Sequence, residues 1–264
     1  MRITRFESAD GRVYTGRLID EHTAQAVTGD LFGTPSFADE KLPIRRLLPP
    51  VEPPNIFAIG RNYRAHIEET GARTPEQPLV FIKATTSLLA PGDQIVLPAA
   101  APNEVDFEAE LALIIGRTAR HVSEDKALDH VLGYTCANDV SARDCQRNDK
   151  QWTRAKGFDT FCPLGPWLVT SEELDPDNCA LRSRLNGQIM QDSNTRNMMH
   201  SCAGLVSYLS RQFTLVPGTV ILSGTPEGVG FARTPPLFLK EGDRIEIEIE
   251  GIGTLSNTVV RERA

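Results

Sequence analysis

The segment Glu104 to Gly116, EVDFEAELALIIG, constrains the fold more than any other part of the chain. It contains Glu108 and Glu110, two residues apart, which lie on the same side of a β-strand but on opposite sides of a helix. We interpret the segment as a strand, because both faces become apolar from Leu111 to Ile115, as in a strand buried on both sides. The two carboxylates are therefore predicted to lie together at the polar end of a buried strand.

Neighbouring buried carboxylates need compensation, because they repel each other and lose hydration at a cost of several kcal/mol. A hard divalent cation with oxygen ligands supplies it. The other interpretation is a strand whose polar end reaches solvent. The segment Ile245 to Glu250, IEIEIE, alternates without a break, so Glu246, Glu248 and Glu250 are expected to face water.

Composition excludes several classes of protein. The 264 residues are 40% hydrophobic and 24% charged, as in an ordinary globular protein. The net charge of −7 and the lack of a Lys/Arg cluster argue against a surface for nucleic acid or anionic membrane. Five cysteines without a CxxC pair suggest neither a disulfide framework nor a zinc site. No apolar run is long enough to span a bilayer, so we expect a soluble, cytoplasmic protein that acts on small molecules.

A proline-rich stretch, Pro49 to Pro54, marks a predicted domain boundary, because four prolines in six residues stiffen the backbone. Residues 1–52, with strands at Ile3 to Phe6 and Val13 to Ile19, are predicted to form a small β-rich N-terminal domain. Residues 53–264 are predicted to form the catalytic domain. Many strands, few helices and no βαβ rhythm indicate an α/β fold that is mostly β.

Four further residues are candidates for chemistry. His66 precedes Glu69 by three residues, so on a helix the carboxylate could orient the imidazole; a solvent-exposed histidine is the other interpretation. The polar segment from His66 to Pro78 is a candidate lid. Asp139 ends a predicted strand and could join the two glutamates, or simply cap a turn. Lys156 lies among Gly, Pro and aromatic residues, where a partly buried lysine needs a negative partner.

Five stretches occur in a specific order along the chain: GRNYRAHIEE, FEAEL, NDVSARDCQ, WTRAKGFDTFCPLGPW and SGTPEGVG. In this order they resemble the fumarylacetoacetate hydrolase (FAH) family, over roughly residues 53 to 260. The resemblance implies a mixed β-sandwich roll that forms a homodimer. It also implies metal ligands, catalytic residues and substrate-binding residues: Glu108, Glu110 and Asp139 for Mg²⁺, or for Mn²⁺ or Ca²⁺ in its place; His66, Glu69 and Lys156 for catalysis; and Arg61, Gln146, Gly224 and Thr225 for the substrate.

The implied substrate is a small anionic 2-oxo acid. The first hypothesis is a metal-dependent hydrolase that cleaves a carbon–carbon bond in 2,4-dioxo acids of the acylpyruvate or fumarylpyruvate type. The second is a decarboxylase, or an isomerase or tautomerase, of oxaloacetate-like or 2-hydroxymuconate-like acids. A third, from another class, is a non-catalytic binder of acidic metabolites.

Overall fold

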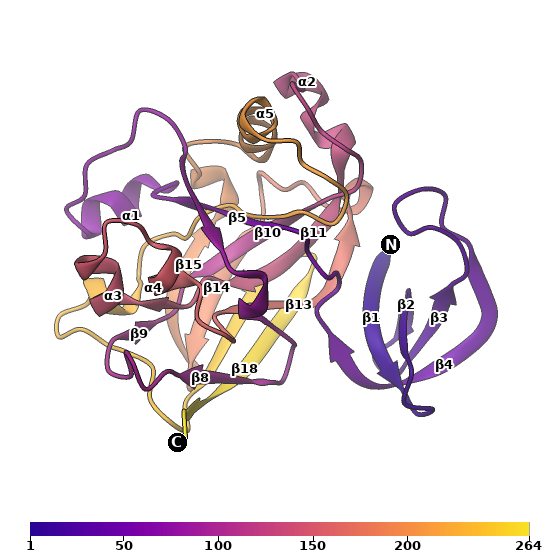
Figure 1. Cartoon of the computed structure of the whole chain (residues 1–264), viewed down its shortest axis with the longest axis horizontal. Coiled ribbons are helices and arrows are strands. Elements are labelled where there is room, and N and C mark those ends of the chain that lie inside the picture. The colour runs from indigo at the N-terminus through magenta and orange to yellow at the C-terminus, as the bar shows by residue number, and fades with distance from the viewer. Residues whose placement is uncertain (264) are drawn as a thin grey trace.

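The first four strands close into a ring in the computed structural model, which describes residues 1–263. β1 pairs with β2 and β4, and β3 pairs with both β2 and β4. The two strands predicted at Ile3 to Phe6 and Val13 to Ile19 are confirmed, and the stretch after them adds two more. These four strands lie to one side of the main body (Figure 1). Their bounds are β1 Arg2–Ser8, β2 Val13–Asp20, β3 Thr23–Val27 and β4 Phe37–Leu48.

The main sheet continues from β1 in the order β13, β11, β10, β16, β5, β6. Its central strand β10 lies between β11 and β16, and every residue of β10 is buried. The prediction of a strand covered on both sides is therefore confirmed. The strands are β5 Ile56–Gly60, β6 Leu79–Lys83, β10 Ala109–Ile115, β11 Val131–Asn138, β13 Cys162–Thr170 and β16 Val220–Leu222, with β7 Leu88–Leu89 paired to β13.

The predicted strand from Glu104 to Gly116 is interrupted at Phe107 and Glu108, which separate a short β9 from β10. At this interruption the side chain of Asn138 accepts the backbone N–H of Glu108, and the carbonyl of Glu108 accepts the N–H of Asp139. The backbone groups of the break thus remain paired, as buried ones must be. The short ladder beside it joins β9 Val105–Asp106 to β12 Ser141–Ala142.

A second sheet, in the order β15, β14, β17, β18, β8, covers one face of the main sheet. Leu111 and Leu113 of β10 share a buried cluster with Leu181 and Ile247 of the second sheet. The dipeptide Asn186–Gly187 predicts a hairpin turn, and it joins the antiparallel strands β14 and β15. The polar residues from Thr170 to Leu185 predict an irregular chain. This prediction is wrong, because Ala180–Leu185 alternates buried and half-buried residues and forms β14. The remaining bounds are β8 Gln94–Leu97, β15 Gln188–Asn194, β17 Arg244–Ile249 and β18 Gly253–Arg261.

Helices are short and lie at the edges of the sheets (Figure 1). The apolar spacing from His200 to Phe213 predicts an amphipathic helix. It is confirmed as α5, which Ser201 caps and which packs against α2. Ser123 as a cap and Gly133 as a stop signal predict a helix between them. α2 ends earlier, at Ala127, because β11 already begins at Val131. The helices are α1 Arg64–Glu69, α2 Glu124–Ala127, α3 Arg143–Asn148, α4 Thr153–Lys156 and α5 Cys202–Gln212.

Single 3-10 turns occur at Thr85–Ser87, Leu128–His130, Ser171–Glu173, Thr195–Asn197 and Gly230–Ala232. Within residues 1–263, no helix has the length and apolarity needed to traverse a bilayer. All five cysteines are buried and free of disulfides, as expected.

Candidate active site

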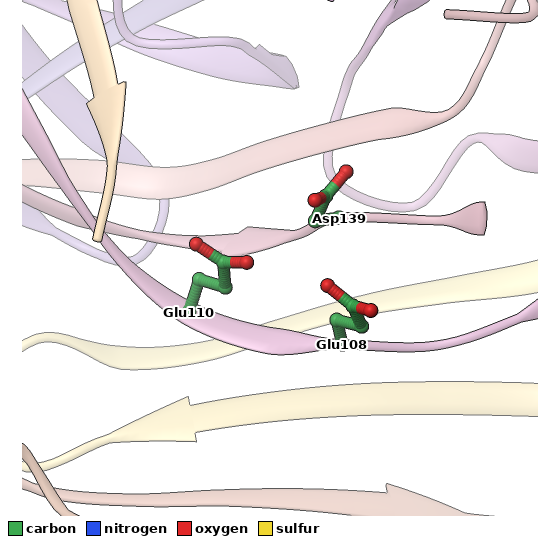
Figure 2. A group of neighbouring side chains, drawn as sticks. All are labelled: Glu108, Glu110 and Asp139. Carbon is green, nitrogen blue, oxygen red and sulfur yellow. The ribbon is translucent and has the colours of Figure 1, made fainter. Parts of the chain in front are cut away.

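Three carboxylates, called the triad below, converge where β10 begins and β11 ends: Glu108, Glu110 and Asp139. Glu108 and Glu110 stand on the same side of their segment, and Asp139 lies on the neighbouring one (Figure 2). Each offers an oxygen atom within 4.8 Å of the other two, and all three side chains are buried. The predicted convergence of these residues is therefore observed, and it follows from the antiparallel pairing of β10 with β11.

Lys156 bridges two of the three carboxylates. Its ammonium lies 2.8 Å from Glu108 Oε2 and 2.8 Å from Asp139 Oδ2. The side chain is only 2% exposed. The expectation that a buried lysine here needs negative partners is thus met. Lys156 is the last residue of α4, so this short helix brings a positive charge to the two carboxylates at the strand ends.

Two further cations support the triad, and sequence reasoning did not assign them. Arg143, at the start of α3, donates to Glu108 Oε1 at 2.7 Å and through Nε to Asp106 Oδ2 at 2.9 Å. Lys83, the last residue of β6, lies 2.5 Å from Asp139 Oδ1, and both side chains are fully buried. The signals in the sequence are a lysine that ends the apolar strand LVFIK and an arginine inside NDVSARDCQ.

The cations compensate the carboxylates unequally. Burial favours the neutral form of Glu108, but Lys156 and Arg143 outweigh it and lower its pKa to about 2. Burial, together with repulsion from Asp139 and Glu108, raises the pKa of Glu110 well above the usual range for glutamate. Within the described chain Glu110 has no ion-pair partner, and its Oε2 accepts only the backbone N–H of Gly224, at 2.6 Å. The triad therefore lacks positive charge at Glu110.

Gly224 holds Glu110 through backbone geometry. Its φ is +101°, and a Cβ there would lie 2.7 Å from the Cβ of Asn62. Only glycine fits this left-handed, crowded position, which aims its N–H at Glu110. The N–H of the predicted substrate-binding residue Gly224 is therefore already committed to the triad.

His66 and Glu69 form a hydrogen-bonded pair on α1. Glu69 Oε1 lies 2.8 Å from His66 Nδ1, and its Oε2 accepts the backbone N–H of Gly228 at 2.8 Å. The helical spacing predicted for this pair is confirmed. Since a carboxylate only accepts hydrogen bonds, we assign the proton of the neutral imidazole to Nδ1, which leaves the lone pair on Nε2.

A cavity of about 240 Å³ brings most of the predicted residues together. The candidates among its walls are Arg61, His66, Glu108, Gln146, Lys156 and Thr225. Gln146 accepts from Arg143 at 2.8 Å. The Thr225 hydroxyl donates to the carbonyl of Ala109 and accepts from Gln191, so its hydrogen is already used. Glu110 and Asp139 lie behind this surface.

Asp106 fixes one wall of the cavity. Its carboxylate accepts the backbone N–H groups of Gly230 and Phe231 as well as the guanidinium of Arg143. The ring of Phe231 lies 4.2 Å from that guanidinium carbon. The loop after β16 is therefore fastened to α3 through one buried aspartate.

Two family models match the chain. Residues 55–260 match the fumarylacetoacetate (FAA) hydrolase C-terminal family, and residues 1–50 match a family described as Rv2993c-like, N-terminal. Protein Rv2993c of Mycobacterium tuberculosis is 45% identical over 270 residues, which cover 99% of each chain. Oxaloacetate tautomerase fahd2, mitochondrial, of Xenopus laevis is 47% identical over 82% of this chain and 69% of its own length.

Solved structures agree with this relationship over the whole chain. The 5-carboxymethyl-2-hydroxymuconate delta-isomerase of Mycobacterium smegmatis is 44% identical and superposes with a TM-score of 0.89, covering 99% of this chain and 100% of its own. The 2-hydroxyhepta-2,4-diene-1,7-dioate isomerase of Mycobacterium marinum is 43% identical, with a TM-score of 0.88 over the whole of both chains. The fold is the mostly β roll that the resemblance implied. This chain belongs to the fumarylacetoacetate hydrolase family.

Proposed function

We propose that the chain catalyses keto–enol tautomerisation of a small dicarboxylic 2-oxo acid of the oxaloacetate type. The observation that supports this most is that one small cavity is lined by both His66 and Lys156. The first can move a proton and the second can stabilise negative charge on oxygen. Relatives named as an oxaloacetate tautomerase and as isomerases support this second sequence hypothesis over hydrolysis.

We assign a divalent cation to Glu108, Glu110 and Asp139. These residues fit such an ion because they offer hard oxygen ligands within reach of one another, and because Glu110 lacks a positive partner. Mg²⁺ is the expected ion, with Mn²⁺ or Ca²⁺ as other candidates. When bound, it supplies Lewis-acid polarisation of the 2-oxo group.

His66 transfers the proton in this proposal. Its Nε2 accepts a proton from the carbon next to the 2-oxo group and passes it to the oxygen of the enolate, which gives the enol. In the reverse direction Nε2 takes the hydroxyl proton and returns it to that carbon. Glu69 keeps Nδ1 protonated and stabilises the imidazolium that forms. Gly228 holds the other oxygen of Glu69, which ties the pair to the loop after β16.

Lys156 donates to the substrate oxygen. An ammonium has three N–H donors, and two of them point to Glu108 and Asp139. The third is available for the oxygen that becomes negative in the enolate. Burial works against the charged form of Lys156, but the two carboxylates outweigh it and raise its pKa, so the group stays an ammonium.

The charges of the site favour an acidic substrate. The buried carboxylates Glu108, Glu110, Asp139 and Asp106 face the three cations Lys83, Arg143 and Lys156, a balance of −1 that a divalent ion changes to +1. Arg61 adds a cation at the cavity wall, where its guanidinium donates to the backbone carbonyl of Arg73. We assign Arg61 to the distal carboxylate of the acid, with Gln146 and Thr225 lining the space between.

The test follows the enol form of oxaloacetate by ultraviolet absorbance, with Mg²⁺ and after treatment with EDTA. We expect conversion to the keto form well above the rate in buffer, and loss of this excess after EDTA. A rate equal to that in buffer with Mg²⁺ present would refute the proposal. Release of CO₂ measured in parallel would identify a decarboxylase. Binding of the acid without turnover would identify a non-catalytic binder of acidic metabolites.

Hydrolysis of a 2,4-dioxo acid is the second candidate, because the family is named for a hydrolase and an imidazole with a free Nε2 can also activate water. Acylpyruvate cleavage, measured as pyruvate release, tests it directly.

The lid at residues 66–78, the homodimer and the cytoplasmic location stay predictions. Slower amide exchange in the lid with oxalate and Mg²⁺, and sedimentation of the purified protein, test the first two.

A further inference from the structure

Each carboxylate of the triad has one oxygen held by a donor other than Lys156. Arg143 holds Glu108 Oε1 at 2.7 Å, the N–H of Gly224 holds Glu110 Oε2 at 2.6 Å, and Lys83 holds Asp139 Oδ1 at 2.5 Å. Each carboxylate is therefore left with a single oxygen that is not fixed in this way. Three single oxygens suit a cation that takes one oxygen from each carboxylate.

Lys83 is the most constrained of these donors. It ends β6, where its backbone is paired with Ile56 of β5, and its side chain is fully buried with that of Asp139. Its ammonium also reaches the carbonyl of Val140 at 3.4 Å. Lys83 is not among the residues that line the cavity, so substrate contact does not account for this buried charge.

We propose that Lys83 is a positioning residue that limits Asp139 to one ligating oxygen and thereby makes the site select Mg²⁺ over Ca²⁺. The inference rests on the proposed metal role of the triad. Ca²⁺ takes six to eight oxygens and often binds both oxygens of a carboxylate, whereas Mg²⁺ takes six in an octahedron. Recruitment of Asp139 Oδ1 by Ca²⁺ would leave the ammonium of Lys83 buried without its partner, which is costly.

The ratio of the two affinities isolates this effect from charge. Removal of the positive charge of Lys83 strengthens the attraction for any divalent cation, and by a similar amount for Mg²⁺ and Ca²⁺. A second free oxygen on Asp139 benefits chiefly Ca²⁺. A shift in the ratio of the dissociation constants therefore reports the number of available oxygens.

The experiment is calorimetric titration of EDTA-treated, dialysed protein with Mg²⁺ and, separately, with Ca²⁺. In Lys83→Met we expect the ratio Kd(Mg²⁺)/Kd(Ca²⁺) to rise by about tenfold relative to wild type, the size typical of changes next to a metal ligand. Lys150→Met is the matched control, because Lys150 is exposed and the same side chain is removed there. Its ratio should equal that of wild type.

An unchanged ratio in folded Lys83→Met overturns the proposal and leaves the metal role intact. Failure of wild type to bind either ion overturns the metal role, and this proposal with it. If the variant does not fold, a crystal structure of wild type with Ca²⁺ decides. Asp139 binding through one oxygen, with Lys83 on the other, supports the proposal; Asp139 binding through both oxygens overturns it.

Discussion

In two places in this molecule glutamates lie two residues apart on one side of an extended chain, and their surroundings differ completely. On β17, Ile245, Ile247 and Ile249 are buried, while Glu246 and Glu248 on the opposite face are partly exposed. Glu248 pairs with Arg184 and Glu246 with Arg244 at the surface. At the start of β10, Glu108 and Glu110 are both buried, so they do not reach bulk solvent in the same way.

Spacing along the chain determines on which side of a strand a side chain lies, whereas the surrounding sheets determine whether that side chain is buried. The expectation that Glu246, Glu248 and Glu250 face water holds in part: Glu250 is exposed, whereas Glu246 and Glu248 pair with arginines. Around β10, compensation comes from buried cations held in place by other elements: Lys83, Arg143 and Lys156. Removal of a charge at β17 should change the stability little, whereas removal of one next to β10 leaves a buried partner of opposite charge unpaired.

The largest expected effect is on activity in Glu110→Gln, compared with Glu248→Gln. Loss of a carboxylate ligand removes metal charge stabilisation, so we expect turnover to fall by about 10³-fold, equivalent to about 4 kcal/mol. Glu248→Gln should keep wild-type turnover. Measurements of kcat/KM with saturating Mg²⁺ test both. Equal activities of the two variants would show that Glu110 matters no more for turnover than the surface residue Glu248.

A smaller loss is expected when the proton carrier is removed but the triad is left intact. His66→Asn should lower tautomerisation by about 10²-fold, within the range usual for a general base. Its affinity for Mg²⁺ should stay that of wild type, because His66 is not one of the assigned ligands. His22→Asn, at an exposed histidine, is the control. Impaired Mg²⁺ binding in His66→Asn would contradict this separation of roles.

The pH dependence of stability should also reveal the buried carboxyl of Glu110. Because the pKa of Glu110 is raised in the folded protein, its contribution to stability is present below the unfolded value of 4.5 and is lost as pH rises through the folded pKa. In EDTA, wild type should therefore lose more stability between about pH 5 and about pH 8 than Glu110→Gln does. Urea unfolding at both pH values tests this. Parallel losses in the two proteins would show that Glu110 is compensated without metal.

The smallest effect is expected for the stability of Glu248→Gln. A partly exposed ion pair contributes little, so the free energy of unfolding should change by less than about 1 kcal/mol. Thermal unfolding in low and high salt measures this change and its screening. A loss of several kcal/mol would mean that the pair of Glu248 with Arg184 resembles the buried pairs at β10.

The sequence alone indicated an extended segment with two glutamates on one side, offered the contact of His66 with Glu69 as one of two interpretations, and indicated the family. These follow from periods of two and of about four residues, and from motif order, all of which are local properties. It also indicated that Lys156 needs negative partners, since its neighbours leave a charge little contact with water. It did not indicate β14, because alternating arginine and serine in a half-buried strand resemble a polar loop.

Only the tertiary structure decided which groups compensate the triad. Lys83 and Asp139 are 56 residues apart, and Arg143 and Glu108 are 35 apart, so no local pattern joins them. Gly224 reaches Glu110 across 114 residues through a backbone N–H, a group that every residue except proline carries. Sheet pairing brings these atoms together, and the identity of a charge's partner is a property of packing rather than of spacing along the chain.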